Sequence, residues 1–299
     1  MDRGEAVAQG RGSLLTQAGS ASGETAELCG PLTPEAVREL ALRGPLYWLR
    51  VRQQPLFDAA LADALLGIAV LENAQFLCSV TRAALQRLLQ IAGLRCLYVN
   101  EIAPRGSPAN FENASLLERF GGDRLVHQAD LLAITRSPAL REFYAIDSRM
   151  TAQTLDAFLA MPTLEMLSLE DCGIDDALAA RFERCPQLQR LFLANNPLGR
   201  EGLTHIARLK QLRELDLWAT PLHVDDFEQL QQLPHLEYLS VGHTGSAKTA
   251  ALGLTAEALL PRLSALTALR RLELDGINVD EKQRAAFAAR FESVQILNR

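Results

Sequence analysis

Leucine and polar residues alternate along the chain in an order that repeats every 24 residues. The segments LEMLSLEDCGI, LQRLFLANNPL and LRELDLWATPL begin at Leu164, Leu188 and Leu212. A softened copy begins at Leu140 and a shorter one at Leu236. Proline marks the same period two residues earlier, in SPAL, MPTL, CPQL and LPHL. A fixed period of this length indicates a repeat architecture, in which each unit buries its core against its neighbours.

Each unit contains two kinds of hydrophobic spacing. The L-x-L alternation has the period of two that is typical of a β-strand. Segments such as DDALAARFERC and DDFEQLQQL space their apolar residues as short helices do. The pattern extends from Leu46 to the closing VQILNR, and it predicts an α/β chain of about ten to eleven stacked strand–helix repeats.

The unit L-x-x-L-x-L-x-x-N-x-L resembles the leucine-rich repeat family over roughly residues 46–299. The resemblance implies a right-handed β-α solenoid, a horseshoe with a parallel sheet on its concave side and short helices on its convex side. Small residues able to hydrogen-bond occupy the ninth position of the unit, where we expect them to satisfy backbone groups of each turn. They are Ser148, Cys172, Asn196, Thr220 and Thr244.

The ends of the chain set the predicted domain boundaries. Residues 1–30 are rich in Gly, Ala, Ser, Thr and Gln, which favours a disordered tail. A composition-encoded secretion signal is a second interpretation of that tail. The repeat domain is predicted to cover residues 31–299, with a cap helix within 31–45 that starts at Thr33-Pro34. No stretch of about 18 apolar residues predicts a membrane span.

Positions three, five and seven of each unit are predicted to point away from the leucines, because successive strand side chains alternate between faces. Five of the six Trp and Tyr residues fall at these positions. Trp and Tyr dominate the energetics of protein interfaces, so the concave face is predicted to bind a protein. The candidate contact residues are Trp48, Tyr98, Tyr144, Phe192, Trp218, Tyr238, Glu142, Arg190, Glu214 and Asp216.

Charge narrows the class of partner. The net charge of −6 argues against nucleic acid and anionic membranes, which attract basic proteins. Arg50 and Arg52 make the N-terminal end of the concave face basic, whereas acidic residues predominate towards its C-terminal end. We therefore expect a protein partner with basic residues opposite the C-terminal half, and we expect the protein itself to be a monomer.

The stretch GHTGSAKT, residues 242–249, resembles a phosphate-binding P-loop. A P-loop requires its second glycine directly before the lysine, and Ala247 occupies that place. We interpret residues 245–253 instead as a loop inserted between repeats. The five cysteines are an odd number without metal spacing, which favours free thiols and predicts neither a metal nor a cofactor.

These observations predict a non-catalytic protein–protein interaction module. The bias towards Leu, Ala and Arg indicates a bacterial genome, in which the protein is expected to be an effector or an intracellular inhibitor. The predicted location is cytoplasmic, or a host cell reached by a signal-peptide-independent route. Two alternatives stay open: a nucleotide hydrolase that uses residues 242–249, and a self-associating structural module.

Overall fold

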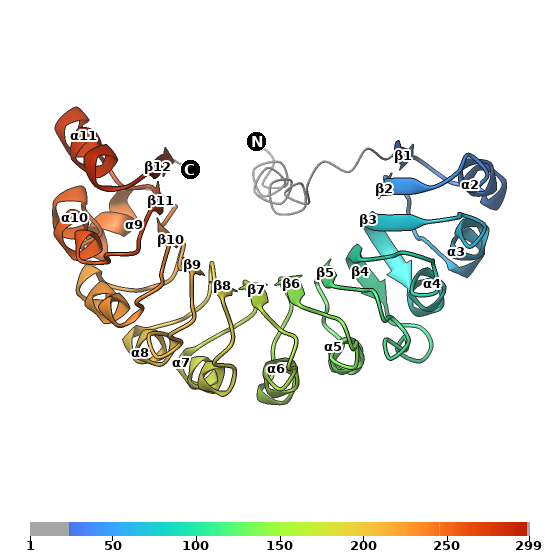
Figure 1. Ribbon diagram of the computed structural model, residues 1–299, viewed down its shortest axis with the longest axis horizontal. Coiled ribbons are helices and arrows are strands. Elements are labelled where there is room, and N and C mark those ends of the chain that lie inside the picture. Colours follow the sequence, from blue (N-terminus) through green and yellow to red (C-terminus); the bar gives the residue numbers. More distant parts are fainter. Residues whose placement is uncertain (1–23, 245, 298–299) are drawn as a thin grey trace.

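The structure is a computed structural model that describes residues 24–244 and 246–297. Twelve strands form a single sheet, and each strand lies beside the next strand in the chain, in the order β1 to β12. The strands line the inner side of an open arc and the helices cover its outer side (Figure 1). This arrangement confirms the predicted α/β solenoid with a concave parallel sheet.

All neighbouring strands are parallel, and their register aligns the unit leucines. Leu167 pairs with Leu191, and Leu191 pairs with Leu215. The strands are β1 (Glu24–Cys29), β2 (Leu46–Arg52), β3 (Leu71–Thr81), β4 (Cys96–Ala103), β5 (Arg119–Asp123), β6 (Glu142–Ile146), β7 (Met166–Glu170), β8 (Arg190–Phe192), β9 (Glu214–Asp216), β10 (Tyr238–Gly242), β11 (Arg271–Asp275) and β12 (Ser293–Leu297).

Polar side chains cap most of the outer helices. The hydroxyl of Thr33 accepts a hydrogen bond from the amide of Ala36, as the predicted helix start requires, and Asp58 caps the next helix in the same way. The helical segments are α2 (Pro34–Ala41), α3 (Ala59–Leu65), α4 (Arg82–Leu88), α5 (Gln128–Ile134), α6 (Ala152–Leu159), α7 (Asp176–Ala179), η1 (Ala180–Arg184), α8 (Arg200–Ile206), η2 (Val224–Gln232), α9 (Ser246–Ala251), α10 (Ala256–Ser264) and α11 (Glu281–Arg290).

Leucine predominates in the core between sheet and helices, and phenylalanine supplies its largest side chains. Phe143, Phe158 and Phe182 are fully buried, and the rings of Phe143 and Phe158 stack with their centroids 4.1 Å apart. Burial of each such side chain contributes about 1.5–3 kcal/mol to folding. These three phenylalanines therefore occupy inward positions of the repeat.

The ninth residue of the unit closes the turn after each strand. The side-chain oxygen of Asn196 accepts from the amides of Cys172 and Ile174 at 3.1 and 2.9 Å. Its nitrogen donates to the carbonyl oxygen of Leu169 at 2.6 Å. Ser148, Cys172, Asn196 and Thr220 are all buried, which confirms the predicted role at these four positions. Thr244 differs, because it is exposed at the start of the insertion.

Two predicted boundaries require correction. Glu24–Cys29 form strand β1 and pair with β2, so the sheet begins at Glu24 and not within a domain that starts at residue 31. Alternation of Thr25, Glu27 and Cys29 with the inward Ala26 and Leu28 explains the strand. The rest of the predicted disordered tail, residues 1–23, lies outside the described residues.

Two further predictions differ from the structure: the capping role of the helix within residues 31–45, and the loop conformation of the insertion. Helix α2 covers the outer side of the arc between β1 and β2, so β1 and not this helix forms the edge of the sheet. The insertion contains helix α9, Ser246–Ala251, where a loop was predicted over residues 245–253. The Ala-rich sequence SAKTAA favours a helix, because alanine has the highest helix propensity.

Candidate protein-binding face

Side chains at the third, fifth and seventh positions of the units form the concave face. Cross-strand pairing joins the fifth positions into one row along the arc. This row contains Arg50, Gln75, Tyr98, Gly121, Tyr144, Ser168, Phe192, Asp216, Ser240 and Glu273. Beside it, Glu142, Arg190, Glu214 and Tyr238 occupy the third-position row. The alternation predicted from sequence thus places the candidate residues on one face.

The aromatic side chains on this face differ in exposure. Trp48, Tyr144, Phe192, Trp218 and Tyr238 are partly buried and keep accessible ring surface. Tyr98 is only 6% exposed, because its ring lies over Gly121. A β-carbon at Gly121 would lie 2.8 Å from the Cδ2 atom of Tyr98. Tyr98 therefore fills the surface beside Tyr144 and offers little area to a partner.

Glu142 organises the middle of the concave face. Its Oε1 atom accepts from Nη2 of Arg190 at 2.6 Å, and its Oε2 atom accepts from the hydroxyl of Tyr144 at 2.6 Å. Burial and the nearby Glu142 carboxylate raise the pKa of Tyr144, so the phenol stays protonated and donates. The Glu142 carboxylate thus holds Tyr144 of β6 and Arg190 of β8 in fixed positions.

A second cluster surrounds Trp218 and Tyr238 at the C-terminal end. The indole nitrogen of Trp218 donates to Oδ2 of Asp275 at 3.0 Å, and the hydroxyl of Tyr238 donates to Oε2 of Glu273 at 3.1 Å. The guanidinium of Arg271 lies 5.3 Å from the centroid of the Tyr238 ring. Glu273 and Asp275 of β11 therefore orient the rings of Tyr238 and Trp218. The two aromatic residues were predicted as contacts, whereas the two carboxylates were not.

Asp216 lies between the acidic side chains of this end. Burial, together with the charges of Glu273 and Glu170, raises the pKa of Asp216 to about 6, although two hydrogen bonds act in the opposite direction. One of these bonds is from the amide of Trp218, at 2.9 Å. A carboxylate kept in an unfavourable electrostatic environment is more common at binding sites than elsewhere on a protein.

The two ends of the concave face carry different charge. From β7 to β11 it presents five carboxylates and two arginines, which leaves an excess of three negative charges. The carboxylates are those of Glu170, Glu214, Asp216, Glu273 and Asp275, and the arginines are Arg190 and Arg271. At the N-terminal end, Arg50 donates to Gln75 at 3.0 Å and Arg52 pairs with Glu27 at 2.7 Å. The predicted charge asymmetry is therefore present on the folded surface.

Residues 117–298 match the family model of the leucine-rich repeats of FBD-associated F-box protein At5g56370. The chain belongs to the leucine-rich repeat family. The crystal structure of an internalin (inlF) from Listeria monocytogenes str. 4b F2365 is similar, with a TM-score of 0.52 and 17% sequence identity. The match covers 98% of this chain and 95% of that chain, and it shows the fold alone. Comparison with curated proteins gave no match.

In this leucine-rich repeat protein, Gly242 and Thr249 of GHTGSAKT serve the fold. Gly242 has a φ of 135°, and a β-carbon there would lie 2.1 Å from the backbone oxygen of Asp275. Glycine is therefore required by the approach of β11 to β10. The hydroxyl of Thr249 donates to the carbonyl oxygen of Gly276 at 2.7 Å, and Lys248 is exposed on the six-residue helix α9.

Metal, membrane and thiol sites each have structural requirements, and the described residues of the leucine-rich repeat fold bear on all three. Within residues 24–244 and 246–297, no three His, Cys, Asp or Glu side chains cluster as metal ligands. In the same residues, no helix has the length and apolar character needed to cross a bilayer. Burial raises the pKa of the Cys172 thiol to about 12, which suppresses the reactive thiolate.

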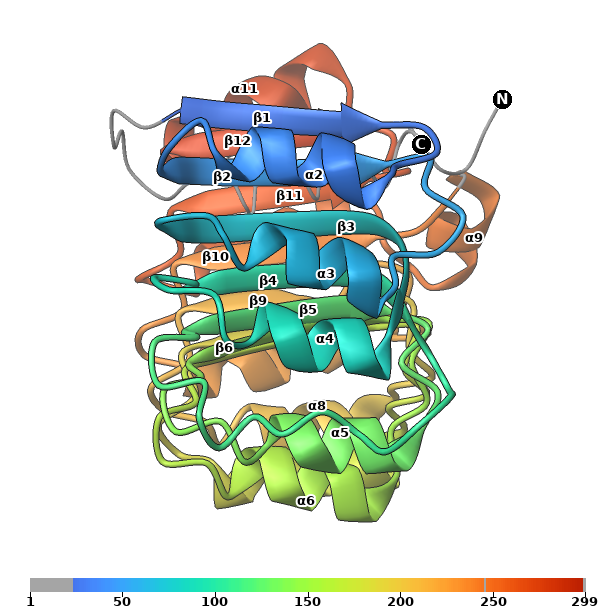
Figure 2. The same cartoon turned by 90° about the vertical axis from the view of Figure 1, so that its right-hand side faces the viewer.

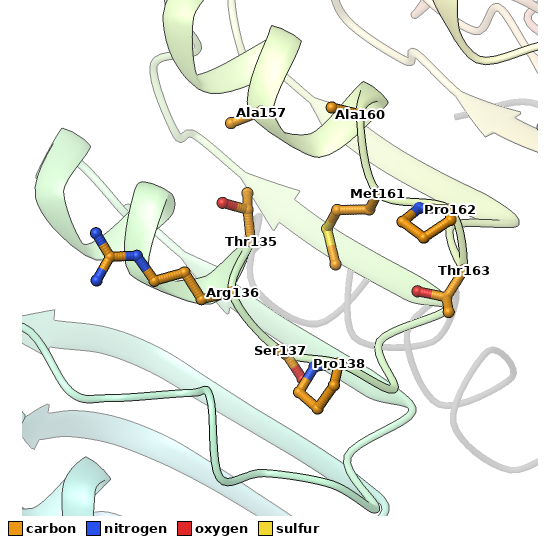
Figure 3. A pocket seen from close by; sticks show the side chains of 9 residues that line it. All are labelled: Thr135, Arg136, Ser137, Pro138, Ala157, Ala160, Met161, Pro162 and Thr163. Atoms are coloured by element: carbon orange, nitrogen blue, oxygen red, sulfur yellow. The ribbon is translucent and has the colours of Figure 1, made fainter.

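A shallow depression of about 350 Å³ lies away from the concave face, between the ends of α5 and α6 (Figure 3). It is lined by residues 135–138, 157 and 160–163. Thr163 uses its hydroxyl to donate to the carbonyl oxygen of Leu140. The hydroxyl of Ser137 is buried and has no hydrogen-bond partner. Because that oxygen is inaccessible from the depression, it offers no contact to a ligand there.

Proposed function

We propose that this protein is a non-catalytic module that binds a folded protein partner on its concave face. The observation that carries the proposal is the fixed position of Tyr144, Trp218 and Tyr238. Each donates to a carboxylate on the same face, and each keeps part of its ring accessible. Side chains that are ordered before binding lose less entropy on association, and aromatic anchors of this kind dominate interfaces.

The shape of the face supports a protein partner in preference to a small molecule. Twelve strands at about 4.8 Å spacing give an inner surface about 50 Å long. Small ligands require enclosed pockets that bury most of their surface. An open arc of this length instead matches the dimensions of a protein domain.

The test compares variants of the concave face against a partner obtained by affinity capture. Tyr144→Ala combined with Phe192→Ala is expected to weaken binding by about 100-fold or more in a calorimetric titration, because two anchors are removed. The matched control replaces the exposed Glu201 and Glu257 on the outer helices with Ala, and we expect unchanged affinity. Equal affinity of both variants for the partner would refute the concave site.

Charge complementarity defines the expected orientation of the partner. Its basic residues are expected opposite the acidic half between β7 and β11, because opposite potentials steer association. The association rate is therefore expected to fall when the salt concentration is raised about tenfold, which shortens the screening length about threefold. A salt-independent association rate would contradict this orientation and leave the aromatic contacts intact.

The nucleotide hydrolase alternative has its own test. We expect equilibrium dialysis to show no Lys248-dependent binding of labelled ATP. Gly242 packs against the backbone of Asp275, and the hydroxyl of Thr249 is already bonded to the carbonyl oxygen of Gly276. Binding that Lys248→Ala abolishes would replace the present proposal with that alternative.

The proposal also covers the oligomeric state, the location and the cellular role of the protein. We propose a monomer that acts inside a cell, either as an intracellular inhibitor or as a bacterial effector delivered into a host. The Leu, Ala and Arg bias supports a bacterial source, and the five free cysteines, four of them buried, support a reducing compartment. Sedimentation at increasing concentration tests the monomer against the self-associating alternative, and cell fractionation tests the location.

A further inference from the structure

The concave face already binds arginine side chains of its own. Arg271 places its guanidinium 5.3 Å from the centroid of the Tyr238 ring, and the same group pairs with Glu214 at 2.7 Å. A cation is attracted both by a carboxylate and by the face of an aromatic ring. The other arginine between β7 and β11, Arg190, pairs with Glu142 at 2.6 Å. Both arginines of the acidic half therefore have a carboxylate partner from the third-position row.

Asp216 lies in the adjoining row with aromatic neighbours but without a cation. The strands lie side by side across the arc (Figure 2), so the third- and fifth-position side chains form adjoining rows. Phe192 of β8 pairs directly across from Asp216, and Trp218 follows Asp216 by two residues on the same face. The Asp216 carboxylate accepts from the amide of Trp218 and from the side chain of Ser240, which are both neutral. Among the described residues, no Lys, Arg or His forms an ion pair with it.

Small residues on β10 leave this carboxylate and the neighbouring indole accessible. The indole of Trp218 crosses β10 to reach the Asp275 carboxylate on β11, and Gly242 has no side chain to obstruct it. Ser240, which pairs directly across from Asp216 on β10, is also small. Asp216 and Trp218 are accordingly only half-buried. A side chain that approaches from the hollow of the arc therefore meets the carboxylate and the indole together.

The charges around Asp216 favour a cation over a neutral group. Besides the larger effect of burial, Glu170 on β7 and Glu273 on β11 are close enough to raise the pKa of Asp216. The remaining charged or titratable side chains on the concave face of β8 to β11 are Arg190, Glu214, Tyr238, Arg271 and Asp275. Because both arginines are already paired, a cation from outside the chain would relieve the repulsion between Asp216 and the two glutamates.

We propose that the protein partner inserts an arginine side chain at Asp216, beside the rings of Phe192 and Trp218. Arginine fits better than lysine, because its planar guanidinium stacks on aromatic rings and donates in a fixed fork to a carboxylate. This inference rests on the proposed function and adds the chemical group that the concave face recognises. Only the ionised carboxylate attracts the cation, so the affinity for the partner is expected to fall as the pH is lowered from neutrality.

Binding of N-acetyl-arginine methylamide to the full chain tests the site without the partner. The backbone amide and indole signals of Trp218 are followed by nuclear magnetic resonance, and the spectrum of Trp218→Phe identifies them. We expect saturable shifts at pH 7.5 and about tenfold weaker binding at pH 5, because the pKa of about 6 leaves roughly one Asp216 carboxylate in ten ionised there. N-acetyl-citrulline methylamide, which has a similar shape and no charge, is expected to cause no shift.

Asp216→Asn is expected to weaken binding of the arginine analogue at least about tenfold and to remove its pH dependence. The asparagine oxygen can still accept from the amide of Trp218, and circular dichroism checks that the variant is folded. Glu214→Gln is the matched control on the same strand. Its carboxylate is already paired with Arg271, so we expect the affinity to stay within about threefold. Equal losses in both variants, or no shift in the wild-type protein, would overturn the proposal.

The captured partner separates this proposal from the proposed function. Its affinity is expected to fall about tenfold between pH 7.5 and pH 5 in the wild-type protein and to be independent of pH in Asp216→Asn. If the arginine analogue does not bind while Tyr144→Ala with Phe192→Ala still weakens the partner, the concave site stands and the arginine contact is wrong. If the analogue binds but that double variant keeps full affinity for the partner, the proposed function fails, and the assignment of the arginine to the partner fails with it.

Discussion

Two different kinds of polar contact hold the turns of the solenoid together. One kind is found before β5 and the other after β6. Between β6 and β10 each turn uses one buried polar residue of its own, such as Asn196, whose side-chain amide bonds only its own coil and the preceding one. Between β3 and β5 the repeat is irregular. Strand β3 extends over eleven residues with a register shift after Phe76, and residues 104–118 contain neither helix nor strand.

A single arginine organises the irregular part. The guanidinium of Arg82 bonds the carboxylate of Asp130, with Nε–Oδ1 and Nη2–Oδ2 distances of 2.9 Å. It also donates to the carbonyl oxygens of Pro104 and Gly106. The side chains of Arg82 and Asp130 are only 10% and 4% exposed. One long-range charged contact thus replaces the local hydrogen bonds that close the regular coils.

The regular and irregular parts are expected to lose stability on substitution to different degrees. A regular coil shares its stability among many equivalent residues, as expected for a solenoid of stacked units. The irregular part depends on one buried ion pair, and removal of one partner from such a pair leaves an uncompensated charge. The largest loss from a single substitution is therefore expected in the irregular part.

Arg82→Ala is predicted to lower the free energy of unfolding by about 3–5 kcal/mol, because Asp130 remains buried without its partner. Urea denaturation monitored by circular dichroism measures this loss. Arg87→Ala is the control, since Arg87 pairs with Asp63 on the exposed surface at 2.7 Å and is expected to cost less than about 1 kcal/mol. Equal losses from both variants would show that the irregular part does not depend on Arg82.

Asn196→Ala is predicted to have the next largest effect, about 2–3 kcal/mol. It leaves the amides of Cys172 and Ile174 buried without an acceptor, and each unsatisfied group costs about 1–3 kcal/mol. Thr220→Val removes one bond, from the Thr220 hydroxyl to the carbonyl oxygen of Leu217, and is expected to cost about 1 kcal/mol. The same urea titration measures the unfolding free energy of both variants. A larger loss for Thr220→Val than for Asn196→Ala would contradict the proposed order.

The regular half could be predicted from sequence because its contacts repeat with the sequence period. The leucine spacing gave the parallel sheet, its two faces and the outward position of Tyr144 and Trp218. Strand β1 was missed because its two inward residues, Ala26 and Leu28, are a weak apolar signal beside a stretch rich in Gly and Ser. Helix α9 was missed because an inserted segment has no place in the period.

Contacts between distant coils could not be predicted from the same pattern. Arg82 and Asp130 are 48 residues apart, and Trp218 and Asp275 are 57 apart, so neither pair falls within one unit. The coverage of Tyr98 depends on the missing side chain of Gly121 in the next coil. Pairings of this kind depend on which side chains of two or three coils meet on one surface, and a one-dimensional repeat does not specify them.

Arg82 and Asn196 stabilise the fold. Asp216, on the concave face of the regular half, is predicted to reduce the stability of the fold. The pKa of Asp216 is raised to about 6 by burial, whereas an aspartate in the unfolded chain has a pKa near 3.9. The folded state therefore binds a proton first as the pH falls. The contribution of Asp216 to stability is greatest below about pH 4 and is lost as the pH rises through 6.

Asp216→Asn is accordingly predicted to raise the free energy of unfolding by about 1–2 kcal/mol at pH 7.5 and to have little effect at pH 4. The asparagine oxygen can still accept from the amide of Trp218, so the local geometry is kept. Glu214→Gln is the control, because Glu214 pairs with Arg271 at 2.7 Å and its loss is expected to destabilise by less than about 1 kcal/mol. Urea titrations at both pH values decide the matter: a carboxylate retained at a cost to stability is expected of a binding surface, whereas a loss of stability at pH 7.5 would make Asp216 an ordinary structural residue.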